Sequence, residues 1–339
     1  MVLTKMLESR QANQKLFESK PLWIVDVGAR FGIHPIFSKI KEFSSFDLFE
    51  ADPEECDRLF IKYNECSTIG ARIFNYAVGS ISAEENLKTK INKYRNPAVS
   101  GVSERTREES PMYDQIASEH ILEGYFESPS CALDDLLIDK QSFPDFLKLD
   151  VEGYEPEVLS GGKAILAKAV GIRIEVSFVK LQSQSPQSGT FPLIHETLTN
   201  FGYTLLSFDY VGRGDYYSPH CAGRYGMLRS TDAVYIRNIK STLQSRSTAL
   251  RAAIFCLINN APDVAVSILT QATSRFGKFS ATSDPLERFM DKALATHLHA
   301  LKWIPGQDRK LHAELYESIF DLTYPSVQKF NESLFYNPA

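Results

Sequence analysis

The run IVDVGARFG at residues 24–32 decides the fold class of this 339-residue chain. Its first four residues read as a buried strand, and Gly28 and Gly32 then bracket a turn that enters a helical segment. Glycine lets the backbone approach a ligand closely and adopt positive φ, and the first amides of the following helix offer free donors. A strand, a glycine turn and a helix in this order are typical of nucleotide-binding α/β folds.

This turn departs from the dinucleotide-binding pattern GxGxxG, because Arg30 stands where a second glycine would meet a pyrophosphate. Asp26 also disfavours phosphate, since a carboxylate beside the turn suits a ligand that carries an ammonium and a sulfonium. S-adenosylmethionine is such a ligand. Two alternatives stay open at this point, a purely structural turn and a nicotinamide-dependent oxidoreductase.

Apolar runs alternate with helix-like segments along the chain, as a parallel sheet with crossover helices requires. Strands are predicted at residues 22–27, 43–49, 72–78, 146–151, 171–178, 203–208 and 233–236, and helices at 33–40, 53–63, 154–166 and 193–201. The last two strands are expected to form an antiparallel hairpin with a wide loop over 209–231. Residues 81–131 are polar and irregular, with a hairpin expected near 87–91, so we expect an active-site cover or a mobile loop there.

From about residue 241 the pattern changes to helical periodicity without strands, which predicts an all-α extension of four or five short helices. We therefore predict an N-terminal helical segment at 1–21, an α/β domain at 22–240 and a helical extension at 241–339. The extension is expected to mediate self-association, as a homo-oligomer, or partner docking.

Charge and composition exclude several classes of function. The formal net charge of -5 gives no basic excess to neutralise phosphates, so we expect no nucleic-acid partner. No apolar stretch is long enough for a signal-peptide core or a membrane span, which favours a cytoplasmic protein without a membrane span. The five cysteines form no CxxC pair and are odd in number, which argues against disulfides and a zinc knuckle.

Acidic and small residues follow the second and third predicted strands. The second ends in FDLFEADPE, where Glu50 is placed to accept hydrogen bonds from both ribose hydroxyls of a nucleoside. Asp52 reads as the cap of the next helix. Ala77 and Gly79, after the third strand, leave room for an adenine ring. Gly79 is also a residue type that is common in turns, so a simple strand-to-loop turn is the alternative.

The run FLKLDVEGYEPEVLSGG at residues 146–162 places Asp150 and Glu152 at the carboxyl end of a buried strand. Such strand ends line the binding crevice of an open α/β sheet, so both carboxylates are expected to face the cofactor or the acceptor. Lys148 is expected either in a salt bridge or in catalysis. Glu175 is costly to bury unpaired, so it is either an ion-pair partner or a site residue.

The remaining chemistry is less specific. His34 and His220 are the histidines near loops that would serve as a base. Arg213, Tyr216 and His220, in the loop after residue 208, are the expected substrate contacts. The carboxylates at 150, 152 and 175 only weakly suggest a magnesium-type site, and we predict no metal. The absence of GxSxG and Walker motifs removes common hydrolases and phosphoryl-transfer enzymes.

In their order along the chain, IVDVGARFG, FDLFEADPE, LDDLL, FLKLDVEGYEPEVLSGG and IRIEVSF resemble the FkbM family of S-adenosylmethionine-dependent methyltransferases. The resemblance covers roughly residues 22–238, and its most specific part is the K-x-D-x-E-G-x-E run that starts at Lys148. It implies a Rossmann-like class I methyltransferase fold with a seven-stranded, mostly parallel sheet. Arg30 stands where the family leads us to expect asparagine.

The resemblance also implies a cofactor, a reaction and a set of site residues. The expected cofactor-binding residues are Asp26, Gly28, Arg30, Gly32, Glu50, Ala77 and Asp150, and the expected catalytic residues are Asp150, Glu152 and Glu175. The implied reaction is O-methylation of a sugar, glycan or natural-product hydroxyl by direct displacement. The alternative is a methyltransferase-like binding module that recruits partners through its helical tail without transferring a methyl group.

Overall fold

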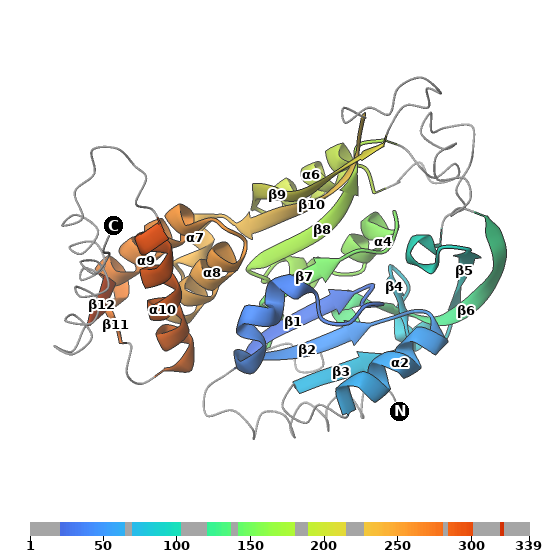
Figure 1. Ribbon diagram of the computed structural model, residues 1–339, viewed down its shortest axis with the longest axis horizontal. Helices are drawn as coiled ribbons and strands as arrows, with labels where there is room; N and C mark the ends of the chain where they lie inside the picture. The colour runs from blue at the N-terminus through green and yellow to red at the C-terminus, as the bar shows by residue number, and fades with distance from the viewer. Residues whose placement is uncertain are drawn as a thin grey trace, which may run out of the picture. The chain divides into compact units, whose positions relative to one another are not determined.

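The computed structural model describes residues 21–64, 70–102, 121–136, 142–179, 189–214, 227–280, 284–300 and 319–321. The chain divides into two compact units, Met1–Ile236 and Arg237–Ala339. The first contains two β-sheets with their helices, and the second is mostly helical (Figure 1). All but the last residue of the predicted N-terminal helical segment lies outside the described residues.

A seven-stranded sheet in the order β3-β2-β1-β7-β8-β10-β9 forms the frame of the first unit. Its strands are β1 Leu22–Val27, β2 Ser44–Phe49, β3 Gly70–Phe74, β7 Phe146–Leu149, β8 Gly171–Ser177, β9 Tyr203–Gly214 and β10 Met227–Arg237. The five strands from β3 to β8 are parallel, and β10 runs antiparallel to β8. The structure thus confirms the predicted Rossmann-like, mostly parallel sheet.

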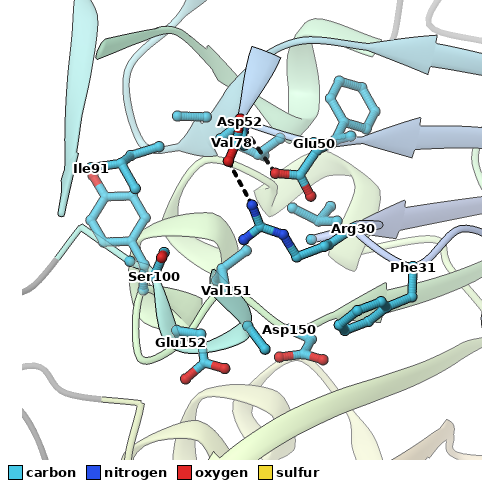
Figure 2. Close-up of a pocket in the computed structure, with 18 of the residues that line it drawn as sticks. Arg30, Phe31, Glu50, Asp52, Val78, Ile91, Ser100, Asp150, Val151 and Glu152 are labelled. Carbon is cyan, nitrogen blue, oxygen red and sulfur yellow. Dashed lines mark hydrogen bonds and ion pairs between the residues drawn. The ribbon is translucent and has the colours of Figure 1, made fainter. Parts of the chain in front are cut away.

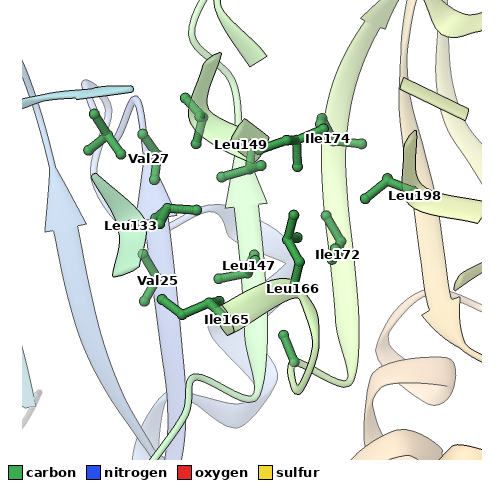
Figure 3. Packing of buried hydrophobic residues seen from close by; sticks show 14 of the residues in the cluster. Val25, Val27, Leu133, Leu147, Leu149, Ile165, Leu166, Ile172, Ile174 and Leu198 are labelled. Carbon is green, nitrogen blue, oxygen red and sulfur yellow. The ribbon is translucent and has the colours of Figure 1, made fainter. Parts of the chain in front are cut away.

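The central strands are buried on both faces because other elements cover both sides of the sheet. All six residues of β1 and all four of β7 are buried. Figure 3 shows how side chains from three strands meet those of helices α5 (Lys163–Leu166) and α6 (Phe191–Asn200). This core contains Val25, Val27, Leu147, Leu149, Ile172 and Ile174 from the strands and Ile165, Leu166 and Leu198 from the helices.

Two predicted helices differ from expectation. The segment predicted at 33–40 is a 3₁₀ helix, η1 (Pro35–Phe43), whereas α2 (Pro53–Asn64) forms as predicted. The helix predicted at 154–166 is interrupted, so that α4 (Glu155–Ser160) precedes α5. A Cβ on Gly161 would lie 2.0 Å from the backbone oxygen of Gly79, so the chain breaks the helix where it packs against another backbone.

The strand predicted at 72–78 is two strands in two different sheets. Its first part is β3 of the large sheet, and its second part is β4 (Ala77–Gly79) of a three-stranded sheet. The break falls at Asn75, whose side-chain amide donates to the backbone oxygens of Glu50 and Ala51 at 3.0 Å each. This anchor redirects the chain away from the large sheet.

The small sheet corrects the expectation of an irregular region at 81–131. Its order is β4-β6-β5, with β5 at Lys88–Tyr94 and β6 at Leu122–Ala132. Short 3₁₀ helices flank these strands: η2 Ala83–Glu85, η3 Pro97–Val99 and η5 Leu133–Leu136. β5 pairs with β6, which follows residues 103–120, and so no local hairpin forms near 87–91. Such a distant partner leaves no local signal in the sequence.

The second unit contains α7 (Ile239–Thr242), α8 (Arg246–Ile258), α9 (Pro262–Phe276) and α10 (Pro285–Ala300). Ten consecutive residues of α8, from Ala249 onward, are buried, so this helix forms the centre of its unit. The extension is not entirely helical, because β11 (Phe279–Ser280) pairs with β12 (Phe320–Asp321). In the part of the chain that the structure describes, no helix has the length and hydropathy needed to cross a bilayer.

Candidate functional site

A cavity of about 530 Å³ lies where the carboxyl ends of β1, β2 and β7 meet. The turns after these strands and Glu175 of β8 line it, as expected for an open parallel sheet. Residues from the small-sheet region, including Ile91, Pro97 and Phe126, line it as well. The region expected to cover the site therefore contributes walls of this cavity.

The glycine turn brings two strand ends together. Gly28 and Gly32 have φ of 80° and 92°, and the amides of Gly28 and Ala29 donate to Phe49 of β2 at 3.0 and 2.9 Å. A Cβ on Gly28 would lie 1.8 Å from the backbone oxygen of Asp150. The sequence argument assigned this glycine to ligand approach, and the structure shows in addition that it allows close contact with the turn after β7.

Arg30 lines the cavity, but its guanidinium binds protein groups. Its Nη2 lies 2.6 Å from Oδ2 of Asp52, and its Nη1 donates to the backbone oxygen of Pro97 in η3. Figure 2 shows this side chain between Glu50 and Asp52 on one side and Asp150 on the other. Arg30 thus connects the glycine turn with the loop after β2 and with the small-sheet region.

Glu50 and Asp52 form a preorganised acidic loop after β2. Oε1 of Glu50 accepts a hydrogen bond from the Asp52 amide at 2.8 Å, and Oδ1 of Asp52 accepts from the Glu54 amide at 3.0 Å. Asp52 is therefore the predicted helix cap. Burial raises the pKa of Glu50, while the Asp52 amide and the Arg30 charge lower it in part. Both acidic side chains line the cavity.

Lys148 is the cation of a buried charge network. Its Nζ lies 3.4 Å from Oδ1 of Asp26 and 3.3 Å from Oδ2 of Asp150, and it donates to the Gly28 oxygen at 3.2 Å. Burial opposes the charge, but Asp150 and Asp26 together raise the pKa of Lys148. Of the two expectations for this lysine, the structure shows the salt bridge.

Asp26 does not line the cavity, although we expected it to contact the cofactor. It is 1% exposed, its carboxylate accepts from the His34 amide at 3.3 Å, and it pairs with Lys148. Burial raises its pKa, and the charge of Lys148 counteracts this effect. In this structure Asp26 influences the site through Lys148 and the start of η1.

Three carboxylates converge at the cavity, those of Asp150, Glu152 and Glu175, with oxygens within 4.8 Å of one another. These are the three predicted catalytic residues. Burial raises the pKa of Glu175 well above its usual value, and the charges of Asp150 and Glu152 raise it further. Carboxylates this close suit a shared proton or a hard cation. The expectation that no metal is needed stays a prediction.

Sequence reasoning missed Glu155, whose side chain holds the turn that contains Glu152. It is 1% exposed, and its Oε1 accepts from the amides of Val151 and Gly153 at 2.9 and 3.3 Å. Burial raises its pKa to about 8. The hydrogen bonds hold a turn in which Glu152 has a φ of 56°. The last glutamate of the K-x-D-x-E-G-x-E run was the available signal.

His34 also lines the cavity, but its ring is not oriented to act as a base. Its Nδ1 accepts a hydrogen bond from the Ile36 amide at 3.3 Å, where it caps η1. Burial, together with the charges of Arg173 and Lys148, lowers its pKa and favours the neutral ring. A neutral ring whose Nδ1 accepts carries its proton on Nε2, so the remaining nitrogen is a donor.

The other predicted residues fall in different places. Ala77 lines the cavity as expected. A Cβ on Gly79 would lie 2.7 Å from the ring of Tyr154, so that glycine accommodates a tyrosine that itself lines the cavity. Arg213 lies in β9, but its side chain is not among those described. Tyr216 and His220 lie outside the described residues.

The chain is distantly similar to several solved structures. A methyltransferase from Aquifex aeolicus matches with 10% identity over 68% of this chain and 97% of that chain, at a TM-score of 0.28. The N-terminal domain of EvdMO1, with S-adenosylhomocysteine bound, matches with 11% identity over 68% of this chain and 80% of that chain, at a TM-score of 0.32. Magnesium protoporphyrin IX methyltransferase from Synechocystis PCC 6803, with S-adenosylmethionine bound, matches with 11% identity over 70% of this chain and 76% of that chain, at a TM-score of 0.26.

Sequence comparison is more informative about the family. No curated protein matches the chain significantly. The model of the methyltransferase FkbM domain matches residues 26–205, which is more than half of the chain and contains the glycine turn, Glu50 and the carboxylate cluster. The chain therefore belongs to the FkbM family and is an S-adenosylmethionine-dependent methyltransferase.

Proposed function

We propose that the chain methylates a hydroxyl oxygen of a sugar, glycan or natural product. The observation that carries this proposal is the convergence of Asp150, Glu152 and Glu175 in the cavity that also contains Glu50. A hydroxyl must lose its proton when its oxygen is methylated, and a carboxylate with a raised pKa is a suitable acceptor near neutral pH.

The residues present fit S-adenosylmethionine. Glu50 keeps one oxygen on the Asp52 amide, and its carboxylate is placed to accept from ribose hydroxyls. Ala77 and Val78, which line the cavity, leave an apolar surface for adenine. The negative charge of the carboxylate cluster suits a sulfonium and an ammonium. When bound, this cofactor supplies an electrophilic methyl group.

The side chains divide the remaining work between orientation and proton transfer. Lys148 orients the carboxylate of Asp150 at 3.3 Å, so that Asp150 accepts a hydrogen bond from the acceptor hydroxyl. Bound S-adenosylmethionine would supply the methyl group that this oxygen accepts, and S-adenosylhomocysteine would be released. The hydroxyl proton passes to Glu175, whose raised pKa makes it a suitable base.

Calorimetric titration with S-adenosylmethionine, S-adenosylhomocysteine and NAD tests the first part of this proposal. We expect the first two to bind, NAD not to bind, and Glu50→Ala to weaken binding by at least about tenfold, because a ribose hydrogen bond to a charged group is lost. Glu54→Ala, on the neighbouring exposed turn of α2, is the matched control. Equal binding by wild type and Glu50→Ala would contradict the assigned ribose site.

The second part requires turnover. Release of S-adenosylhomocysteine is measured with a panel of hydroxylated acceptors, before and after treatment with EDTA. Product formation that survives EDTA supports transfer through the carboxylates without a metal. Cofactor binding without any product across sugars and phenols would instead favour the binding-module alternative.

A further inference from the structure

Phe31 is an exposed aromatic residue in a functional cavity. Its exposed fraction of 79% is the largest among the exposed large hydrophobic residues that the structure describes, and of these Phe31 alone lines the cavity. Its neighbours in the turn offer no free apolar side chain, because Ala29 is 1% exposed and Arg30 binds Asp52. Only Phe31 of this turn therefore offers an apolar side chain at the opening of the cavity.

The backbone around Phe31 is held in place, so its exposure is built into the turn. The Gly32 amide donates to Ala29 at 2.7 Å, and the Ile33 amide donates to the Tyr63 hydroxyl at 2.8 Å. The backbone oxygen of Phe31 accepts from Nζ of Lys62 at 3.2 Å. An aromatic side chain on a backbone held in this way is a surface on which a ligand ring can stack.

The charges of the cavity restrict what can stack there. Asp150, Glu152 and Glu175 form one acidic cluster, and Figure 2 shows the first two on the same side of Arg30 as Phe31. Among the described residues, the two lysine and arginine side chains that line the cavity are both in ion pairs, Arg30 with Asp52 and Lys148 with Asp26 and Asp150. The carboxylates of this cluster would repel an anionic group on the acceptor.

We propose that Phe31 and the carboxylate cluster form the acceptor subsite, which selects an uncharged ring with adjacent hydroxyls and rejects its anionic counterpart. One face of the ring stacks on Phe31, and the reacting hydroxyl reaches the carboxylates. The proposal rests on the proposed function, and it makes Phe31 a specificity-determining residue. The ring is either a pyranose, with its apolar C–H face, or an arene diol.

Two matched pairs of probes test the subsite, and methyl transfer is measured as S-adenosylhomocysteine release with product mass. The pairs are methyl β-D-glucopyranoside with methyl β-D-glucuronide, and catechol with protocatechuate. We expect wild type to methylate at least one neutral ring with a kcat/KM at least about tenfold above that of its anionic match. The pair that reacts identifies the source of the ring.

Variants of Phe31 then test whether this residue contributes to acceptor binding. Phe31→Ala is expected to raise the KM of the accepted ring about tenfold, with kcat and the calorimetric Kd of S-adenosylhomocysteine changed less than about twofold. Phe31→Tyr should restore the KM. Phe60→Ala is the control, since Phe60 is 56% exposed on α2 and does not line the cavity.

Provided that wild type binds S-adenosylhomocysteine, three results would overturn the proposal. The first is no methyl transfer to either neutral ring, and the second is equal transfer to the neutral and anionic members of a pair. The third is an equal effect of Phe31→Ala and Phe60→Ala on the KM of the acceptor. A parallel loss of cofactor affinity in Phe31→Ala would place the residue in the cofactor site and would overturn it as well. Absence of cofactor binding by wild type would instead contradict the proposed function.

Discussion

One buried cation, Lys148, pairs with two carboxylates that have different roles in this site. Asp26 lies inside the protein, whereas the side chain of Asp150 is 39% exposed. Ion pairs of this kind are costly to break from one side only, because the remaining charge is left buried. The lysine therefore links the stability of the turn after β1 to the orientation of the reactive carboxylate.

Asp150→Asn is predicted to lower kcat about a hundredfold while changing the Kd of S-adenosylhomocysteine less than about threefold. The amide keeps the shape of the side chain but loses the charge that Lys148 holds towards the acceptor. Steady-state kinetics and calorimetry on the same preparation separate the two effects. Equal losses in turnover and cofactor affinity would refute this division of labour.

The pH dependence of turnover is predicted to depend on Glu175. Because its pKa is raised well above the usual value, the protonated form persists towards neutral pH and cannot accept a proton. Turnover by wild type should therefore rise with pH as Glu175 ionises. Glu175→Gln should lose most turnover and this rise together. A variant that keeps the wild-type pH profile would show that another group is the base.

Glu155 is predicted to make folding stability depend on pH. Its folded pKa of about 8 lies above the usual 4.5, so the folded state binds the proton more tightly than the unfolded state. The contribution is fully present below pH 4.5 and is lost as pH rises through about 8, with a slope of at most about 1.4 kcal/mol per pH unit.

Glu155→Gln tests this sign, because glutamine keeps an acceptor for the Val151 and Gly153 amides without the charge. Denaturant unfolding between pH 5 and 8 should show wild type losing stability relative to the variant. Glu157→Gln, on the same helix, is the control and should follow wild type. Parallel pH curves for wild type and Glu155→Gln would contradict the prediction.

At the scale of elements, α4 and β4 approach each other closely at Gly161, between α4 and α5. A Cβ on Gly161 would meet the backbone oxygen of Gly79 at 2.0 Å, and backbone cannot rotate away as a side chain can. Gly161→Ala is therefore expected to destabilise the first unit by about 1–3 kcal/mol. Gly124→Ala, where a Cβ meets nothing within 4 Å, is the matched control. Equal melting temperatures for the two variants would argue against a tight α4–β4 contact.

At the scale of the whole molecule, each unit has its own core, with Ile172 in the sheet and Leu269 in α9 both fully buried. Calorimetric unfolding is predicted to show two transitions. Ile172→Ala should lower one of them and Leu269→Ala the other, each through a loss of about 2–5 kcal/mol. A single transition that both variants shift would show that the units unfold together.

The helical extension lies outside the family match, which ends at residue 205. We predict that it mediates self-association or partner docking. Light scattering on the full chain over a dilution series tests the first possibility, since a reversible oligomer loses mass on dilution. A constant monomer mass would leave partner docking as the predicted role.

The sequence by itself determined the features that depend on local order. Alternation of apolar runs and helical segments predicted the sheet, and the two glycines marked the turn after β1. The acidic residues after β2 and β7, and Glu175 within β8, were predicted as site residues because parallel strands bring their carboxyl ends to one edge. The family resemblance then supplied the cofactor, and the family match covers residues 26–205.

Only the tertiary structure decided features that depend on partners distant in the chain. β5 pairs across residues 103–120 with β6, Arg30 binds Asp52 and Pro97, and Asp26 is buried under Lys148 instead of lining the cavity. A residue's periodicity says whether it faces a core, but the identity of its partner is set by loop closure and packing across the whole unit. The exposure of Phe31 has the same origin, because the Arg30 and Lys62 contacts fix the turn that presents it.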